Sequence, residues 1–415
     1  MAESKEIPAP REALGAVRAD PIRAARDVEH LGRASWRSAV ESLHAGLRRS
    51  GYAAIEHIPT VPHRFALPYE PGNLWAFLTG RGRRLCQQSV APGLYRKLQR
   101  WRRPLLEQQL AFFFLGEPLA EASAAELLNQ TSGAPPLDNL MRESIVTPAD
   151  QPGCVVCRLR FVPTGELLIV TDRDDRSIPD FVYMGRDSLV FAERLRRSLH
   201  GRRFARALDL CCGTGVQGLT ASDFADRVEG TDINPRAAAF ANLNAWLAGL
   251  DGRCTFAQGD LAAAVDGPID LIVANPPYVY LPESERTINR DGFGGDLGLE
   301  IAGRILSELD RLLADGGEAH IVCDSPVIAG QSSLEQLIRR LLSGQRLGAV
   351  MTEVRYSVYR QYAAFHRTRG ISHVIYYHVQ ISRGLTGVNV RRLPFGSRLA
   401  QSAYCKLVEP IYART

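Results

Sequence analysis

Apolar residues in the first 180 positions are spaced for helices and then for a hairpin. They recur at helical spacing over residues 21–52, and a second helical stretch covers roughly Leu94–Leu115. A short helix is expected at Ala122–Leu128. The segments CVVCRLRFVP and ELLIVTD alternate as strands do and meet at Thr164 and Gly165. They predict a β-hairpin at the end of this part.

From about residue 203, strand-like and helix-like segments alternate. The predicted strands are ARALDL, DRVEGTD, CTFAQGD, IDLIVAN and EAHIVCD, and the clearest helices between them are Pro235–Ala248 and Leu299–Ala314. This alternation is typical of a parallel sheet with crossover helices. Two long strand candidates follow, LGAVMTEVRYS and ISHVIYYHVQIS, and we expect them to complete the sheet as an antiparallel edge pair. The second half therefore predicts an α/β fold with a mostly parallel sheet.

These patterns divide the chain into four expected segments. Residues 1–20, rich in Pro, Ala and charge, form a flexible tail. Residues 21–180 form a mainly helical substrate or accessory domain, whose helices and terminal hairpin suggest a winged-helix-like module. Residues 181–345 form the α/β unit. Residues 346–415 add the last strands and a substrate-facing extension.

Composition narrows the class of protein. The 415 residues are 45% apolar and 23% charged, as in a globular protein. No apolar run approaches the ~20 residues of a membrane span, and the N-terminus does not resemble a secretory signal. We therefore expect a cytoplasmic protein without membrane association. The pair Cys154 and Cys157 has no second Cys or His pair at zinc spacing, so we interpret it as strand residues and expect no metal site.

The net charge of +5 is unevenly distributed. Between Arg81 and Arg103 lie eight basic residues and no acidic one. Such a run can attract RNA phosphates. It is also compatible with a solvated helix face whose Arg stems pack on apolar surface.

A glycine-rich loop follows the first predicted strand of the α/β unit. The strand passes through Asp209 into the sequence CCGTGVQG, residues 211–218. Glycines let a ligand approach the backbone without Cβ clashes, and the following helix N-terminus favours an anionic group. Asp232 closes the second strand, where its carboxylate can accept from both hydroxyls of a ribose. Together the loop and the acid indicate nucleotide binding.

Two classes of nucleotide fit this loop. Gly213, Gly215 and Gly218 satisfy the GxGxxG pattern, and Asp232 lies near the spacing of a dinucleotide site, so an oxidoreductase is one alternative. Asp209 argues against it, because dinucleotide folds usually carry an apolar residue there. An acid at that position can orient the loop and bind the ammonium group of an amino acid.

The fourth predicted strand ends in Asn275-Pro276-Pro277-Tyr278. Ligand sites of open parallel sheets lie at the carboxyl ends of strands, which puts this tetrapeptide beside the glycine loop. The two prolines force an extended exit and supply no N–H donors. The carbonyls of Asn275 and Pro276 can hold the hydrogens of a planar amine or amide nitrogen while the Tyr278 ring packs on its face. This arrangement favours in-line methyl transfer from a sulfonium to nitrogen by positioning and fixed dipoles.

The glycine loop and Asn-Pro-Pro-Tyr together resemble the class I S-adenosylmethionine-dependent methyltransferases. That group includes the protein-glutamine methyltransferases of peptide release factors, the "methyltransferase small domain" ribosomal RNA enzymes and the adenine-specific DNA methyltransferases. The resemblance covers about residues 180–325. It implies a Rossmann-like fold, S-adenosylmethionine as cofactor, S-adenosylhomocysteine as product, and an amide or amine nitrogen as acceptor.

The resemblance also assigns roles to residues. The catalytic residues would be Asn275, Pro276, Pro277 and Tyr278. The cofactor-binding residues would be Asp209, Cys211, Gly213, Gly215, Asp232, Ile233, Asp260, Leu261 and Asn275, followed by Arg186, Asp187 and Ser188. The last three also fit a capping turn that opens a helix at Ser188–Leu199. The loop departs from the group by carrying Cys211 where glycine is commoner.

The acceptor is left open, because the first 180 residues do not resemble the substrate module of the release-factor enzymes and the last 70 residues are not assigned to any module. The first expectation is a nitrogen on a protein, peptide or small molecule. O-methylation of a small natural product is an alternative, with His366, His373 or His378 as general base. RNA methylation is another, and a non-catalytic nucleic-acid-binding or scaffold protein is an alternative of a different class. The polar segment VYLPESERTINRDGFGGDLG is expected to form a substrate-facing lid, with candidate contacts at Glu283, Glu285, Arg286, Arg290 and Asp291.

Overall fold

A computed structural model describes residues 31–54, 104–173, 180–287, 289–357, 359 and 362–393. The predicted tail at residues 1–20 and the basic run Arg81–Arg103 lie outside these residues. Within them, no helix has both the length and the apolar character needed to cross a membrane.

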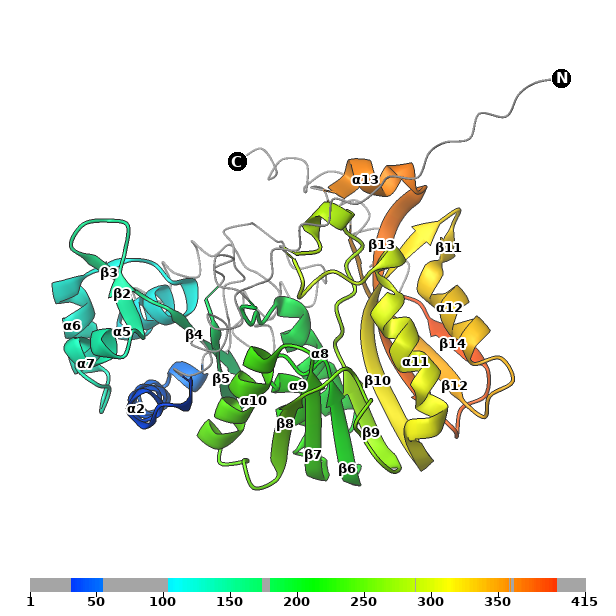
Figure 1. The fold of residues 1–415 in the computed structure, drawn as a ribbon, viewed down its shortest axis with the longest axis horizontal. Helices are drawn as coiled ribbons and strands as arrows, with labels where there is room; N and C mark the ends of the chain where they lie inside the picture. The colour runs from blue at the N-terminus through cyan, green and yellow to red at the C-terminus, as the bar shows by residue number, and fades with distance from the viewer. Residues whose placement is uncertain are drawn as a thin grey trace, which may run out of the picture.

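A mixed sheet forms the centre of the larger part of the molecule (Figure 1). Among the described residues it has nine strands in the order β14-β12-β13-β10-β9-β6-β7-β8, with β11 paired to β10. β9 is buried along nearly its whole length, as expected for a central parallel strand covered on both faces. The strands are β6 (Phe204–Leu210), β7 (Ala225–Asp232), β8 (Cys254–Gln258), β9 (Ile269–Ala274), β10 (Leu313–Ile328), β11 (Gln331–Ser332), β12 (Gly348–Ser357), β13 (Ile371–Ser382) and β14 (Val388–Arg391).

The sheet confirms the predicted α/β class and refines its edge. β6, β7, β8, β9 and β10 pair in parallel, as expected. The two long C-terminal strands are antiparallel to each other, but β13 lies between β10 and β12 and is antiparallel to both. The short strand β14, which was not predicted, pairs in parallel with β12 and takes the edge position. Residues on both sides of the expected boundary at 345 therefore share one sheet.

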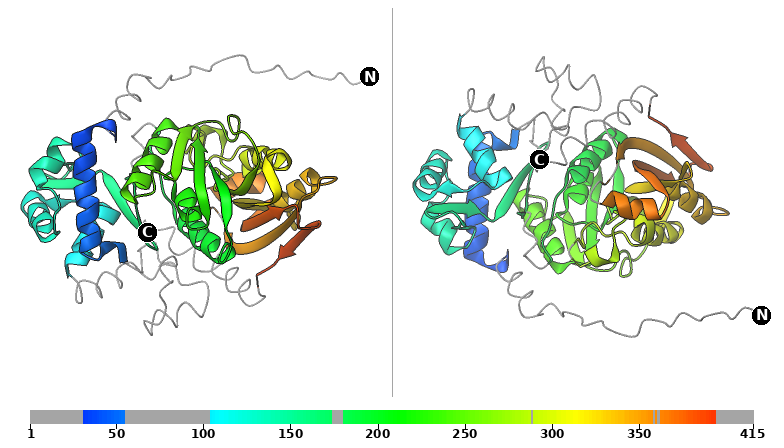
Figure 2. Two further views of the ribbon diagram at one scale, coloured as in Figure 1. Left: turned by 90° about the horizontal axis from the view of Figure 1, so that it is seen from below. Right: turned by 90° about the horizontal axis from the view of Figure 1, so that it is seen from above.

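Helices cover both faces of this sheet (Figure 2). They are α8 (Arg186–Ser198), α9 (Val216–Ala221), α10 (Pro235–Leu247), α11 (Glu300–Leu312), α12 (Ser333–Leu341) and α13 (Ala363–Thr368), with 3₁₀ turns η3 (Glu283–Glu285) and η4 (Asp296–Gly298). The start of α10 is set locally. Asn234 caps it by accepting from the backbone N–H of Arg236, and Pro235 occupies the first turn. The predicted helices at 235–248 and 299–314 are thus confirmed within two residues.

The smaller part combines short helices with two small sheets. Its predicted long hairpin is divided: β3 joins β1 and β2 in one antiparallel sheet, and only β4 pairs with β5. The last turns of the second predicted helix form a π-helix, η2. The elements are α2 (Ala34–Arg49), η1 (Tyr52–Ala54), α5 (Pro104–Gln109), η2 (Leu110–Leu115), β1 (Leu119–Ala120), α6 (Glu121–Gln130), α7 (Leu137–Arg142), β2 (Val146–Pro148), β3 (Cys154–Cys157), β4 (Leu159–Thr164) and β5 (Leu167–Asp172).

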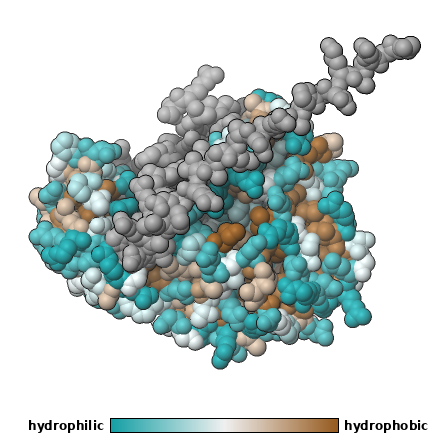
Figure 3. All heavy atoms as spheres, viewed as in Figure 1, coloured by the Kyte–Doolittle hydropathy of each residue, from teal (hydrophilic) through white to brown (hydrophobic). Residues whose placement is uncertain are grey.

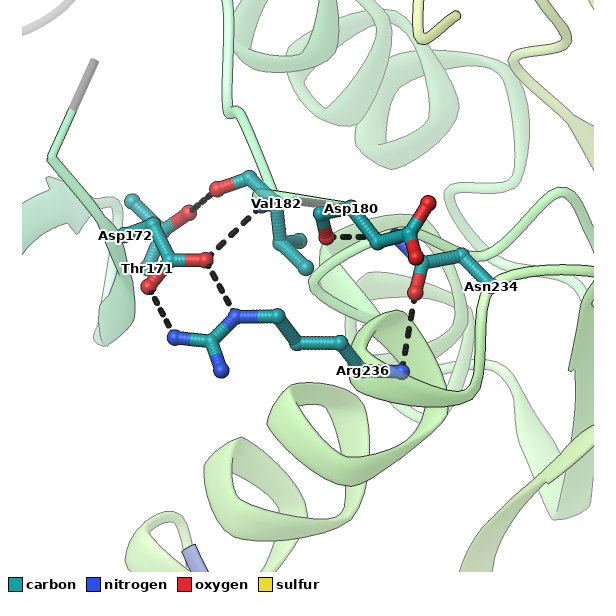
Figure 4. A network of polar contacts seen from close by, with 6 residues as sticks. All are labelled: Thr171, Asp172, Asp180, Val182, Asn234 and Arg236. Atoms are coloured by element: carbon teal, nitrogen blue, oxygen red, sulfur yellow. Dashed lines mark hydrogen bonds and ion pairs between the residues drawn. The ribbon is translucent and has the colours of Figure 1, made fainter. Parts of the chain in front are cut away.

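Strand β5 connects the smaller part to the α/β unit. Asp172, at its end, accepts from Arg236 of α10 at 2.6 and 2.7 Å and from the backbone N–H of Val182 at 2.9 Å (Figure 4). The Asn234 side chain in turn donates to the backbone carbonyl of Asp180 at 2.8 Å. About two turns further along the helix, Asn244 pairs with both backbone groups of Val170. The hairpin is therefore tied to both halves of α10, and the segment from 180 is tied to the start of this helix.

Candidate active site

The glycine loop connects β6 to α9 at the carboxyl edge of the sheet. Gly213 and Gly215 both have positive φ, at 52° and 77°, and Cys211 shares this conformation at 58°. A Cβ on Gly215 would come within 2.9 Å of the Ala241 side chain, so the loop packs closely against α10. A Cβ on Gly213 would meet nothing within 4 Å, so this side of the backbone is open to a ligand.

Asp209, near the end of β6, holds this loop through a hydrogen bond. It is 1% exposed, and its Oδ2 accepts from the backbone N–H of Gly218 at 2.7 Å. Burial raises the pKa of this carboxyl to about 8, and the nearby carboxylate of Asp232 adds to the rise. A cation bound beside Asp209 would favour its charged form. The predicted role in orienting the loop agrees with this contact.

Asp232 closes β7 and faces the same loop. Its Oδ2 accepts from the backbone N–H of Gly213 and its Oδ1 from that of Asn234, each at 2.9 Å. Burial raises the pKa of this carboxyl despite both hydrogen bonds. Beside it, Ile233 is 65% exposed, which is unusual for a large apolar side chain.

Figure 3 shows that the visible face is mostly hydrophilic, with apolar patches on the half built from the large sheet.

Asp260 and Leu261 lie farther along the same edge, after β8. Asp260 is exposed and pairs with Arg304 of α11 at 2.8 Å. Leu261 has a φ of 51°, and its carbonyl accepts from the hydroxyl of Thr231 at 2.8 Å. A hollow of about 520 Å³ borders both residues and is lined further by α11 and α12. Arg304 was not among the predicted site residues, because a sequence does not reveal which helical side chain crosses to a loop.

The Asn275-Pro276-Pro277-Tyr278 loop lies at the end of β9, next to β6. The side-chain amide nitrogen of Asn275 donates to Asp187 Oδ2 at 3.2 Å and to Ser188 Oγ at 3.1 Å. A carboxylate only accepts hydrogen bonds, so this contact also fixes which way the amide is turned. The amide oxygen, Oδ1, is buried and has no hydrogen-bond partner among the described residues.

Tyr278 completes the anchoring of this loop. Its hydroxyl donates to the same Oδ2 of Asp187 at 2.8 Å, and its ring lies 5.7 Å from that of Tyr376, centroid to centroid. Burial raises the pKa of this hydroxyl well above its usual value, so Tyr278 is a neutral donor. Asp187 and Ser188, in the first turn of α8, thus contact the predicted catalytic loop directly. The side chain of Arg186 lies outside the described residues.

The structure also locates the remaining candidates. His366 is buried, and its Nε2 lies 2.8 Å from the backbone carbonyl oxygen of Tyr280. His378 is also buried, and its Nε2 lies 2.9 Å from Nδ1 of His320. In the predicted lid, Arg290 pairs with Asp180. Glu283 and Arg286 pair with each other on the surface at 2.8 Å.

Cys154 and Cys157 are free thiols of β3. Within the described ranges no group of three or more His, Cys, Asp or Glu side chains is arranged to hold a metal.

A second set of polar residues lies beside Tyr278 and was not among the site residues predicted from the sequence. It comprises Asp324 of β10, Arg355 of β12, Tyr376 of β13 and Tyr359, and we call it the β10–β13 polar cluster. Asp324 and Tyr376 are each 1% exposed. The signal for this cluster in the sequence was Asp324, an acid within the mainly apolar strand segment HIVCDSPV. Buried acids are rare without a partner.

Comparisons with known proteins match the α/β part of the chain. The family model of the methyltransferase small domain matches residues 186–360. A release factor glutamine methyltransferase of Deinococcus radiodurans is 35% identical over 140 residues, which are 30% of this chain and 49% of that protein. A ribosomal protein uL3 glutamine methyltransferase of Bradyrhizobium diazoefficiens is 36% identical over 136 residues, 30% of this chain and 42% of that protein. The chain thus spans about half the length, or less, of these relatives.

Among solved structures, a ribosomal protein L11 methylase from Lactobacillus delbrueckii subsp. bulgaricus is 20% identical, with a TM-score of 0.33. The likeness covers 48% of this chain and 80% of that one. The matched domain contains the glycine loop, Asp232 and the Asn275–Tyr278 loop in one continuous unit. Residues 186–360 are therefore similar to the methyltransferase small domain of class I S-adenosylmethionine-dependent methyltransferases.

Proposed function

We propose that this protein transfers a methyl group from S-adenosylmethionine to the amide or amine nitrogen of an acceptor held by the Asn275–Tyr278 loop. The side-chain amide of a protein glutamine is the acceptor we favour. The observation that carries the proposal is the Asn275 side chain. Its nitrogen is anchored by Asp187 and Ser188, while its oxygen is buried and free to accept from an N–H group.

The residues at the glycine loop fit the cofactor. The open side of Gly213 leaves room for close approach of a ligand to the backbone. Asp232 offers carboxylate oxygens where ribose hydroxyls can donate, and the exposed Ile233 offers an apolar surface for an adenine ring. The negative charge of Asp209 would favour binding of the ammonium group of the cofactor, and its hydrogen bond to the backbone of Gly218 would keep the glycine loop in position. When bound there, S-adenosylmethionine supplies an electrophilic methyl group.

The chain's own residues would hold and orient the acceptor. Asn275 Oδ1 accepts one hydrogen of the acceptor nitrogen, and the backbone carbonyl of Pro276 accepts another. Tyr278, fixed through Asp187, presents its ring to the face of the acceptor group. Drawing both hydrogens toward carbonyl oxygens aims the nitrogen lone pair, so positioning and fixed dipoles supply the catalysis. No covalent intermediate with the protein is required.

Two further points support nitrogen over oxygen as the acceptor atom. Of the three histidines considered as general bases for a hydroxyl, His366 and His378 are buried in contacts with other protein groups. The two curated relatives described above are both named as glutamine methyltransferases. RNA as acceptor was suggested by Arg81–Arg103, which lies outside the described residues. O-methylation and a purely binding role have no specific observation in their favour.

Calorimetric titration tests the cofactor half of the proposal. We expect micromolar binding of S-adenosylmethionine and S-adenosylhomocysteine and no binding of NAD. Binding of NAD alone would refute the assignment. Transfer of a labelled methyl group to candidate acceptors then tests the other half, because nuclease-sensitive label would indicate RNA and base-labile label would indicate a methyl ester. Label that resists both treatments and is recovered as N-methylglutamine supports the proposal.

A further inference from the structure

The β10–β13 polar cluster lies on three adjacent strands of the sheet. Asp324 of β10 is directly opposite Tyr376 of β13, and Arg355 of β12 is opposite Tyr376 on its other side. Side chains of opposed residues on antiparallel strands share one face of the sheet. The guanidinium carbon of Arg355 accordingly lies 4.9 Å from the centroid of the Tyr376 ring.

Three members of the cluster each have one buried polar atom with no hydrogen-bond partner among the described residues. These atoms are Oδ1 of Asp324, Nε of Arg355 and the hydroxyl of Tyr376. The other carboxylate oxygen of Asp324 accepts from the hydroxyl of Tyr359, which fixes the direction of Oδ1. Buried polar groups without partners are rare in native proteins, so three of them on adjacent strands call for an explanation.

The cluster adjoins the proposed acceptor site. The ring of Tyr376 packs against that of Tyr278, whose hydroxyl is held by Asp187. Asp187 also anchors Asn275. A continuous set of contacts therefore runs from the Asn275 amide to Asp324.

We propose that Asp324, Arg355 and Tyr376 form a subsite that binds a neutral amide group of the methyl acceptor. Asp324 Oδ1 accepts the amide N–H, while Arg355 Nε and the Tyr376 hydroxyl donate to the amide carbonyl. The inference rests on the proposed nitrogen methylation. It adds residues that select the acceptor and that lie outside the Asn275–Tyr278 loop.

The charges of the cluster select the ligand class. Asp324 and Arg355 attract each other electrostatically, so the pair is close to neutral overall. A phosphate would be repelled by Asp324 and an ammonium by Arg355, whereas an amide presents a donor and an acceptor side by side. The amide is a peptide group next to the target residue, because both N–H hydrogens of the target carboxamide are held by Asn275 and Pro276.

The test measures binding of short peptides to the full chain in the presence of S-adenosylhomocysteine. One probe is acetyl-Ala-Gln-Ala N-methylamide, and its partner has norvaline in place of Gln, so that only peptide groups remain. In Asp324→Asn, Tyr359 still donates to the side-chain oxygen, so an N–H group replaces the free acceptor. We expect this variant and Arg355→Lys to bind the Gln peptide about tenfold more weakly or worse. Tyr376→Phe should weaken binding about threefold to tenfold.

Controls separate the subsite from folding and from the cofactor. The dissociation constant of S-adenosylhomocysteine should be unchanged in all three variants, and Tyr376→Phe removes only one oxygen if the other two fold poorly. Asp270→Asn is the matched carboxylate control, because Asp270 accepts from a backbone N–H at the opposite end of the sheet. This control should bind the peptide as the unaltered protein does.

The outcomes are distinct. Equal loss of affinity for both peptides supports the subsite with a peptide group as its ligand, and loss for the Gln peptide alone overturns it. Unaltered affinity in the three variants, or no binding of either peptide by the unaltered protein, overturns the subsite. Nitrogen methylation is judged separately by labelled methyl transfer, which can persist when the subsite fails.

Discussion

Replacing Asp187 by Ala should release the orientation of the Asn275 side chain. In the native protein, Asp187 Oδ2 accepts from both the Asn275 amide nitrogen and the Tyr278 hydroxyl. Ala at position 187 offers no acceptor, so the Asn275 nitrogen keeps only its contact with Ser188 Oγ. Because a hydroxyl can also donate, Asn275 can then turn and offer its oxygen to Ser188. Its nitrogen would then face the acceptor.

The size of the effect follows from the contact that is lost. A hydrogen bond to a charged group contributes about 1.5–3 kcal/mol, and each 1.4 kcal/mol is a factor of about ten. The orientation of Asn275 that accepts from the substrate should therefore lose about tenfold to a hundredfold in population. Because this orientation acts on the acceptor nitrogen, kcat should fall by a similar factor. Cofactor affinity should stay the same, since the change is confined to the acceptor side.

Two measurements decide the matter. Methyl-transfer kinetics at saturating cofactor give kcat, and calorimetric titration gives the affinity for S-adenosylhomocysteine. The Ser188→Ala variant is a useful companion, because it removes the second contact of Asn275 while the contact with Asp187 remains. An unchanged kcat in Asp187→Ala would refute the orienting role. A loss of cofactor affinity as large as the loss of rate would instead support Asp187 as a cofactor-binding residue.

Further predictions follow from single contacts. Asn275→Ala should reduce methyl transfer about a hundredfold or more while cofactor binding persists, and normal turnover in kinetics would remove Asn275 from the mechanism. Asp232→Ala should weaken cofactor binding in titration, because it also releases the backbone N–H of Gly213. Arg236→Leu leaves the Asp172 carboxylate buried without its ion-pair partner and should cost about 3–5 kcal/mol of unfolding free energy in denaturant melts. Burial lowers the folded pKa of His378 below 6.5, so the unfolded chain binds that proton more readily and stability should fall as pH drops below about 6.5. Thermal melts between pH 7 and 5 should show a shallower fall in His378→Gln.

The parallel strands were predictable because a strand covered on both faces needs a continuous apolar sequence, and IDLIVA has one. Strand order at the C-terminal edge was not predictable in the same way. The position of β13 between β10 and β12 depends on long-range pairing, and periodicity in one segment carries no information about its neighbour. The hairpin was misjudged for a related reason. Strand-like apolar residues lie on both sides of Arg158, so the sequence does not show that the chain passes there from one sheet to another.

The candidate site divides along the same line. Residues at strand ends, such as Asp209, Asp232 and Asn275, were predictable because the topology brings the carboxyl ends of parallel strands together. Asp324 and Arg355 were missed, since each lies within a strand whose partners were unknown. Asp187 was found through its resemblance to a cofactor segment, whereas its observed contacts are with Asn275 and Tyr278. Which groups meet across the sheet is decided by three-dimensional packing.

The attachment of β5 to α10 has a consequence for where the chain can be divided. The part that matches the methyltransferase small domain begins at residue 186, yet Asn244 holds both backbone groups of Val170 and also the carbonyl of Thr214 in the glycine loop. The matched part is therefore shorter than the set of residues whose hydrogen bonds hold α10 and the glycine loop together. A fragment cut at the family boundary would leave the amide of Asn244 and the guanidinium of Arg236 without their partners on β5. Any swap of the N-terminal part between relatives would have to carry residues 159–185 with the catalytic half.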